Sequence, residues 1–191
     1  MTTPLRRLDL RHPVVPSEQW DVRRMGPEAA GGGQVYLWED AVEELIYAGL
    51  SAPRSLQTAL LAGGSWEGPD GRFIEVRGYT ELGRPADLGA FCRELTEDWT
   101  LVRNRVARRD PPMLVLGWVV MGPDVTTGDG LAEELQRVHR TFFNLPHQVT
   151  LTISTSTSTV ALYGFDERGR LINIGFHLVR RRAHRGSGTA R

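Results

Sequence analysis

MLVLGWVVM, residues 113–121, is the stretch that decides the fold class of this chain. It is almost continuously apolar, as expected of a central strand that is buried on both faces of a sheet. Pro111 and Pro112 stop the segment before it, and Gly122 and Pro123 follow it. A strand of this kind is covered by helices in α/β proteins. The stretch therefore predicts an α/β fold.

Helical patterns flank this strand. Apolar residues recur every three or four positions over residues 88–106 and again over residues 131–142, which Pro146 closes. A third such pattern covers residues 41–50; Glu39 and Asp40 precede it, where acidic side chains suit a helix N-terminus. We therefore expect about three helices.

Six shorter segments read as strands. Residues 149–154 alternate apolar and polar side chains, which gives the strand one apolar face. The turn sequences at residues 68–71 and 166–169 predict hairpins. The tract STSTST, residues 154–159, reads as an exposed turn between strands. The predicted strands are residues 34–38, 58–62, 73–79, 149–154, 159–165 and 171–179.

Composition and the order of elements indicate one domain. The chain has 191 residues and no formal net charge, so its overall charge favours neither nucleic acid nor an acidic membrane surface. Residues 1–33, rich in proline and glycine, are predicted to be a flexible arm, 34–179 the domain and 180–191 a basic, disordered tail. All 23 basic residues are arginine, which indicates GC-rich coding of a bacterial type.

The chain is expected to be cytoplasmic. Its one cysteine, Cys92, cannot form a disulfide within the chain, which fits a reducing compartment. Cys92 lies on an apolar helical stripe and is expected to be a small core residue. No signal-peptide pattern and no run of 18 apolar residues is present, so no membrane span is predicted.

Several separated motifs, in this order of elements, resemble the JAB/MPN (Mov34) family. Residues 59–64 (ALLAGG) resemble the family's glycine-ended apolar strand, and Gly117-Trp118 resembles the "GW" before its metal motif. Residues 142–146 (FFNLP), followed by VTLTIS, resemble a later segment, and 162–165 (LYGF) its next strand. The resemblance covers about residues 34–179. It implies a JAB/MPN-like, cytidine-deaminase-like mixed β-sheet.

Active members of that family resemble zinc hydrolases with a catalytic glutamate, a His-x-His-Pro segment, a serine and an aspartate. Imidazole and carboxylate groups hold Zn²⁺ and leave one position for water. Aligned on Gly117-Trp118 and Pro123, this chain carries Leu56 for the glutamate, Val120 and Gly122 for the histidines, and Thr126 and Asp129 for the serine and aspartate. The resemblance therefore implies a pseudoenzyme with no catalytic residues, no metal and no cofactor. Asp129 is expected to be a helix N-cap.

Other chemical signals are weak. No two histidines have the spacing of zinc ligands on one helix, and His139 and His147 are expected to be polar surface or capping residues. No serine-hydrolase elbow, Walker loop or paired-cysteine zinc motif is present.

Binding functions remain open. The first reading is a scaffold or adaptor that binds proteins through residues 41–50 or 87–109, or a peptide strand in the vestigial groove at Pro123. Trp99, Arg103 and Arg105 are candidate contacts; the alternative is that Trp99 is a core residue and the arginines solvate the helix end, where cations suit the dipole. The partner could be another MPN-like domain, giving a homo- or heterodimer. The alternatives are an unorthodox metal-dependent isopeptidase, and binding of nucleic acid or an anionic surface through Arg180, Arg181 and Arg182.

Overall fold

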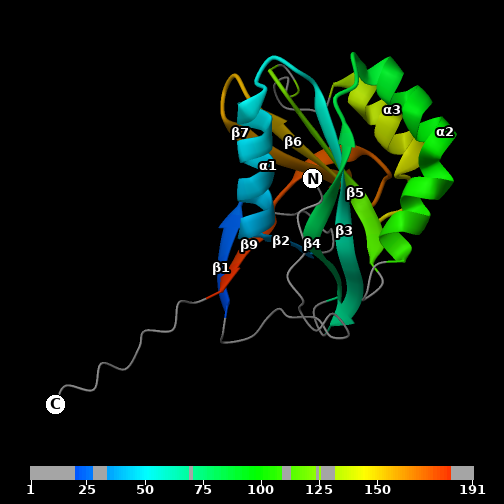
Figure 1. Ribbon diagram of the computed structural model, residues 1–191. Helices are drawn as coiled ribbons and strands as arrows, with labels where there is room; N and C mark the ends of the chain where they lie inside the picture. Colours follow the sequence, from blue (N-terminus) through cyan, green and yellow to red (C-terminus); the bar gives the residue numbers. More distant parts are fainter. Residues whose placement is uncertain are drawn as a thin grey trace.

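The computed structural model describes residues 20–27, 34–68, 71–108, 113–123, 125 and 132–181. Over these residues the chain is a mixed α/β protein with one curled nine-stranded sheet and three helices (Figure 1). The α/β class predicted from residues 113–121 is confirmed. The predicted mixed sheet and the three predicted helices are also present.

Except for an added first strand and a divided last one, the elements follow the predicted order along the chain. The helices are α1 (Glu39–Ser51), α2 (Leu88–Ala107) and α3 (Glu133–Phe142). The strands are β1 (Trp20–Met25), β2 (Gln34–Trp38), β3 (Gln57–Gly68), β4 (Gly71–Gly83), β5 (Leu114–Gly122), β6 (Val149–Ser154), β7 (Thr159–Phe165), β8 (Leu171–Ile174) and β9 (Phe176–Arg181).

The sheet has the order β1-β9-β2-β4-β3-β5-β6-β7-β8. The predicted strand over residues 171–179 is divided: β8 forms one edge, and after Gly175 the chain continues as β9 beside the other edge. A β-carbon on Gly175 would lie 2.2 Å from the carbonyl oxygen of Pro27. Glycine is needed because the backbone just after β1 crosses here, where the two edges of the curled sheet approach.

Strand β1 is the main difference from the sequence prediction. It lies inside residues 1–33, predicted as a flexible arm, and it pairs antiparallel with β9. Trp20 is buried and meets Trp38 edge-on at 4.7 Å between ring centroids. Arg180 and Arg181, predicted to begin the disordered tail, belong to β9, whereas Arg182 lies outside the described residues.

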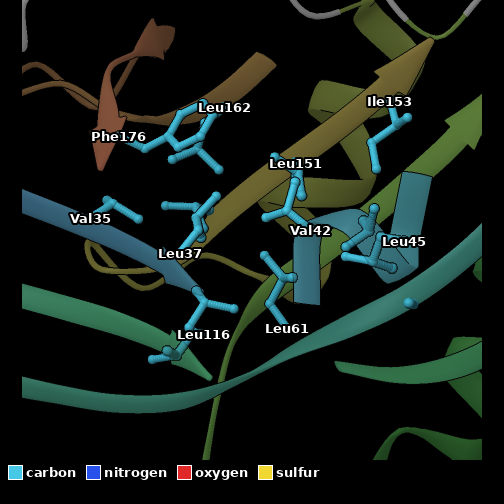
Figure 2. Packing of buried hydrophobic residues seen from close by; sticks show 14 of the residues in the cluster. Val35, Leu37, Val42, Leu45, Leu61, Leu116, Leu151, Ile153, Leu162 and Phe176 are labelled. Carbon is cyan, nitrogen blue, oxygen red and sulfur yellow. The ribbon is translucent and has the colours of Figure 1, made fainter. Parts of the chain in front are cut away.

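One face of the sheet, the α1 face, packs against α1. Val42 and Leu45 of the helix contact a cluster of buried side chains that is almost wholly aliphatic (Figure 2). Every second residue of β6, Val149, Leu151 and Ile153, belongs to this cluster, as the alternation in the sequence predicts.

The opposite face, the α2–α3 face, is covered by α2 and α3 (Figure 1). Its buried cluster is rich in aromatic side chains: Trp118 stacks between Phe91 and Phe143, with centroid separations of 5.3 and 5.9 Å. Because β5 contributes to both clusters, it is buried on its two faces as predicted.

A β-bulge in β5 decides which residues face which helices. Leu61 of β3 pairs with Gly117 and Ala62 with Val115, so Leu116 is the extra residue. Leu116 therefore belongs to the α1-face cluster, although Trp118, two residues later, belongs to the α2–α3 cluster. Gly117 has a φ of 147°, a backbone conformation that favours glycine.

Candidate functional site

Two of the positions that the family resemblance assigns to a zinc site, Val120 and Gly122, lie at the end of β5, between β3 and β6. Val120 in β5 pairs with Thr58 of β3 on one side and with Thr152 of β6 on the other. Gly122 pairs with Ser154. Since directly paired residues point to the same face, these side chains form a continuous patch next to the start of β3.

Aliphatic groups fill the centre of this patch. Val120 is fully buried. A β-carbon on Gly122 would lie 3.3 Å from Val125 Cγ1 and 3.7 Å from Leu56 Cδ1. The structure thus brings together Leu56, Val120 and Gly122, three of the degenerate positions, and adds Val125. None of these side chains has a lone pair to offer a cation.

Hydroxyl groups line the β6 side of the patch. Thr152 donates to the carbonyl of Ala161 over 3.3 Å, and Ser154 donates to the carbonyl of Pro123 over 3.3 Å. Ser156 donates a second, shorter hydrogen bond to the same Pro123 carbonyl. The predicted turn that contains Ser156 is present, and it fixes Pro123 at the end of β5.

A second group of polar atoms lies deeper under α3. His139 is fully buried, and its Nδ1 lies 2.6 Å from the hydroxyl oxygen of Thr150. Its ring meets Phe165 edge-on at 5.0 Å. Burial, with a smaller contribution from the nearby Arg140 charge, lowers the pKa of His139 to about 4. The imidazole is therefore neutral at pH 7.

The expectation that His139 is a surface or capping residue is wrong. Position 139 follows Leu135 by four residues and Val138 by one, so it falls within the apolar stripe of α3. The apolar stripe therefore predicts a buried residue at position 139, although histidine is polar. His147 is half-buried, and its pKa is lowered by burial and by the charge of Arg72.

Within the described part of the chain, three atoms of the α2–α3 face are buried without a hydrogen-bond partner. They are Trp118 Nε1, His139 Nε2 and Thr58 Oγ1. Among the same residues no group of three His, Cys, Asp or Glu side chains lies close enough to share a metal ion. Thr126 and Asp129 lie outside the described residues. The N-cap predicted for Asp129 is taken by Ala132, because α3 begins at Glu133.

The predicted binding residues of α2 are in different environments. Trp99 is half-buried, and its ring centroid lies 5.9 Å from that of Phe142 and 5.4 Å from that of Phe143, so it joins α2 to α3. Arg103 and Arg105 are exposed. Cys92 is partly buried and packs against the buried cluster of the α2–α3 face, as its place on the apolar stripe predicts. Burial raises the pKa of its thiol.

The predicted basic cluster at the end of the chain is partly engaged by the sheet. Arg180 is exposed, and its Nε lies 3.6 Å from Glu39 Oε2 at the start of α1. Arg181 pairs with Trp20 through the backbone of β9 and β1. No helix in the described part of the chain is long and apolar enough to span a membrane.

Comparisons with known proteins place few constraints on this chain. No family model and no curated protein matches it. Among solved structures it is similar to the solution structure of protein DSY2949 from Desulfitobacterium hafniense, a structural genomics target. The two are 17% identical, the match covers 73% of this chain and 89% of the other, and the TM-score is 0.45.

Proposed function

We propose that this chain is a JAB/MPN-like domain without hydrolase chemistry and that it acts as a scaffold or adaptor by binding a protein partner. The observation that carries the proposal is the contact among Leu56, Gly122 and Val125 beside the buried Val120. The motif resemblance places a glutamate and two histidines at three of these positions. The fold brings the three positions together, as that resemblance requires, and leucine, valine and glycine cannot bind zinc or transfer a proton.

The surface best suited to a partner lies along α1. Tyr47 is 78% exposed and Leu50 is 49% exposed, three residues apart on one helix face. A groove of about 800 Å³ runs between this helix, the start of β3 and the end of β4. Glu43, Glu44 and Glu81 line it, with Arg84 as the one basic lining residue among those described. A basic, extended segment of a protein fits this charge.

Trp99 offers less to a partner than the sequence suggested. Its ring packs between α2 and α3, so replacing it would disturb the fold as well as any interface. Leu101, two residues further along α2, points away from that contact and is 58% exposed. It provides a matched control for Tyr47, because both are exposed apolar residues on helices.

The test is binding to a purified partner identified by capture from the native source. We expect Tyr47→Ala to weaken binding at least about tenfold, as interface tyrosines do, and Leu101→Ala to leave it unchanged. Raised salt should weaken binding further because the groove is acidic. Equal affinities of the two variants would remove α1 from the interface.

Two further measurements address the alternative functions. Equimolar zinc retained by the purified protein, or isopeptidase activity that a chelator abolishes, would contradict the loss of hydrolase chemistry. Salt-sensitive binding of nucleic acid that disappears when residues 182–191 are deleted would favour the basic tail instead.

A further inference from the structure

A cavity of about 170 Å³ lies where the starts of β2, β4 and β6 meet the ends of β7 and β8. It is at the opposite end of β2 from α1, which begins after Trp38. The floor is formed by Val35, Ile74 and Val149, all buried members of the α1-face cluster. Mouths of curled β-sheets are a common place for small-molecule sites.

The rim of the cavity carries polar groups. Arg72, His147 and Gln34 line it together with the apolar side chains. Arg72 pairs with Glu67 over 3.3 Å, but both side chains are more than half exposed. Such exposed pairs contribute little stability, so the guanidinium can exchange this partner for another anion.

The position of His147 at the rim is fixed by the buried Gln148. The side chain of Gln148 donates from Nε2 to the carbonyl of Val115 and accepts from the backbone N–H of Leu145, both over 3.1 Å. The backbone N–H of Gln148 donates back to the carbonyl of Leu145 over 2.9 Å. This turn before β6 therefore fixes the backbone that carries His147, which lines the same cavity as Arg72. Burial, with a smaller contribution from the Arg72 charge, lowers the pKa of His147.

The size and chemistry of the cavity define a ligand class. A dry protein cavity of about 150 Å³ holds benzene, so this one accepts an apolar body of about six carbon atoms. An arginine at the rim favours a carboxylate, which its fork of N–H groups can bind in two places. We propose that the cavity binds a carboxylate attached to an apolar group of this size, either as a free small acid or as the C-terminal residue of another chain.

This inference is independent of the proposed function, since the cavity lies on other residues than the α1 groove and the degenerate zinc positions. The probes are phenylacetate, phenylacetamide and 2-phenylethylamine, titrated into the ¹⁵N-labelled full chain by NMR. Phenylacetate should shift the amide signals of Val35, Ile74 and Val149 and raise the pKa of His147. The amide and the amine should bind at least about tenfold more weakly, because neither satisfies the guanidinium.

Two further probes identify the source of the ligand. A short peptide that ends in phenylalanine with a free carboxylate is compared with the same peptide amidated at its C-terminus. Tighter binding of the free peptide than of phenylacetate assigns the site to a protein C-terminus; the reverse order assigns it to a small acid. Failure of every carboxylate to shift the cavity signals would overturn the proposal.

Variants separate the rim from the cavity. Arg72→Gln should weaken phenylacetate binding at least about tenfold, whereas Arg84→Gln, in the α1 groove, should not. A β-carbon on Gly164 would lie 2.8 Å from Ile174 Cδ1, so Gly164→Ala should push that side chain into the cavity and abolish binding. If Gly164→Ala fails to fold, Ile174→Phe blocks the same space. Unchanged affinity in Arg72→Gln, or in a folded blocking variant, contradicts the site.

Discussion

The α1 face and the α2–α3 face of the sheet are built from different chemistry. The buried cluster of the α1 face is aliphatic apart from Met121 and Phe176. The α2–α3 face combines a stack of aromatic rings with buried polar residues, among them His139, Thr58 and Thr150. Stability on the first face comes from burial of apolar area, which is insensitive to pH.

The second face includes groups that oppose folding. A buried polar atom without a hydrogen bond costs about 1–3 kcal/mol. The described residues include three such atoms on the α2–α3 face, Trp118 Nε1, His139 Nε2 and Thr58 Oγ1. Val120, one of the positions that the family resemblance assigns to a zinc site, lies on the same face and pairs with Thr58. Polar chemistry is thus concentrated on one side of the sheet, and the two faces should respond differently to substitution and to pH.

Gly117→Ala should break the separation of the two faces. The added β-carbon would lie 1.9 Å from the carbonyl oxygen of Val149, and the φ of 147° is strained for any residue with a side chain. The bulge that places Leu116 and Trp118 on opposite faces could not persist. We expect a loss of at least about 4 kcal/mol in the free energy of unfolding, or no folded protein, by urea denaturation.

Gly122→Ala is the matched control in the same strand. Its β-carbon would make only a close contact with Val125 at 3.3 Å and an ordinary one with Leu56. We expect the free energy of unfolding to change by no more than about 1 kcal/mol. Similar losses of stability in the two variants would mean that the bulge does not determine which side chains of β5 point to which face of the sheet.

The bulge also shows how far the sequence could predict this fold. The apolar run at residues 113–121 predicted a strand buried on two faces, and that is confirmed. Alternation alone, however, would put Leu116 and Trp118 on the same face. The conformation of Gly117 depends on its contact with Val149, more than 30 residues away in the sequence, so no local sequence pattern could predict the bulge.

Strand β1 and the patch at the degenerate positions illustrate the same limit. Trp20–Met25 has two arginines and one aspartate among six residues, and it is a strand because β9 provides its hydrogen bonds. The resemblance assigned Leu56 and Gly122 to one site from motif spacing alone, and a β-carbon on Gly122 would lie 3.7 Å from Leu56 Cδ1. Val125 and the serine bonds to Pro123 depend on loop geometry that composition does not encode.

Acid should weaken the α2–α3 face selectively. The pKa of His139 is about 4 in the folded protein against an ordinary 6.5, so the unfolded chain binds the proton more readily. Its contribution to stability is therefore complete above pH 6.5 and is lost as the pH falls towards 4. These values correspond to about 2 kcal/mol lost between pH 7.5 and pH 5, measurable by urea denaturation at the two pH values.

His139→Leu should remove most of this acid sensitivity, since leucine fits the apolar stripe of α3 and does not titrate. His147→Gln is the control. The pKa of His147 is also lowered, but its ring is only half-buried, so the variant should keep most of the loss in acid. An unchanged acid loss in His139→Leu would show that another group is responsible.

The smallest expected effect has opposite signs at two threonines of the α2–α3 face. Thr58 Oγ1 is buried with no hydrogen-bond partner in the described part of the chain, whereas Thr150 Oγ1 lies 2.6 Å from His139 Nδ1. Valine has nearly the shape of threonine, so each substitution mainly removes a hydroxyl. Thr58→Val should stabilise the protein by about 1 kcal/mol, because an unsatisfied oxygen leaves the interior. Thr150→Val should destabilise it by about 1–2 kcal/mol, because it leaves the imidazole without its partner. Destabilisation by Thr58→Val would mean that its hydroxyl is hydrogen-bonded in solution, and the cost assigned to this face would then be too high.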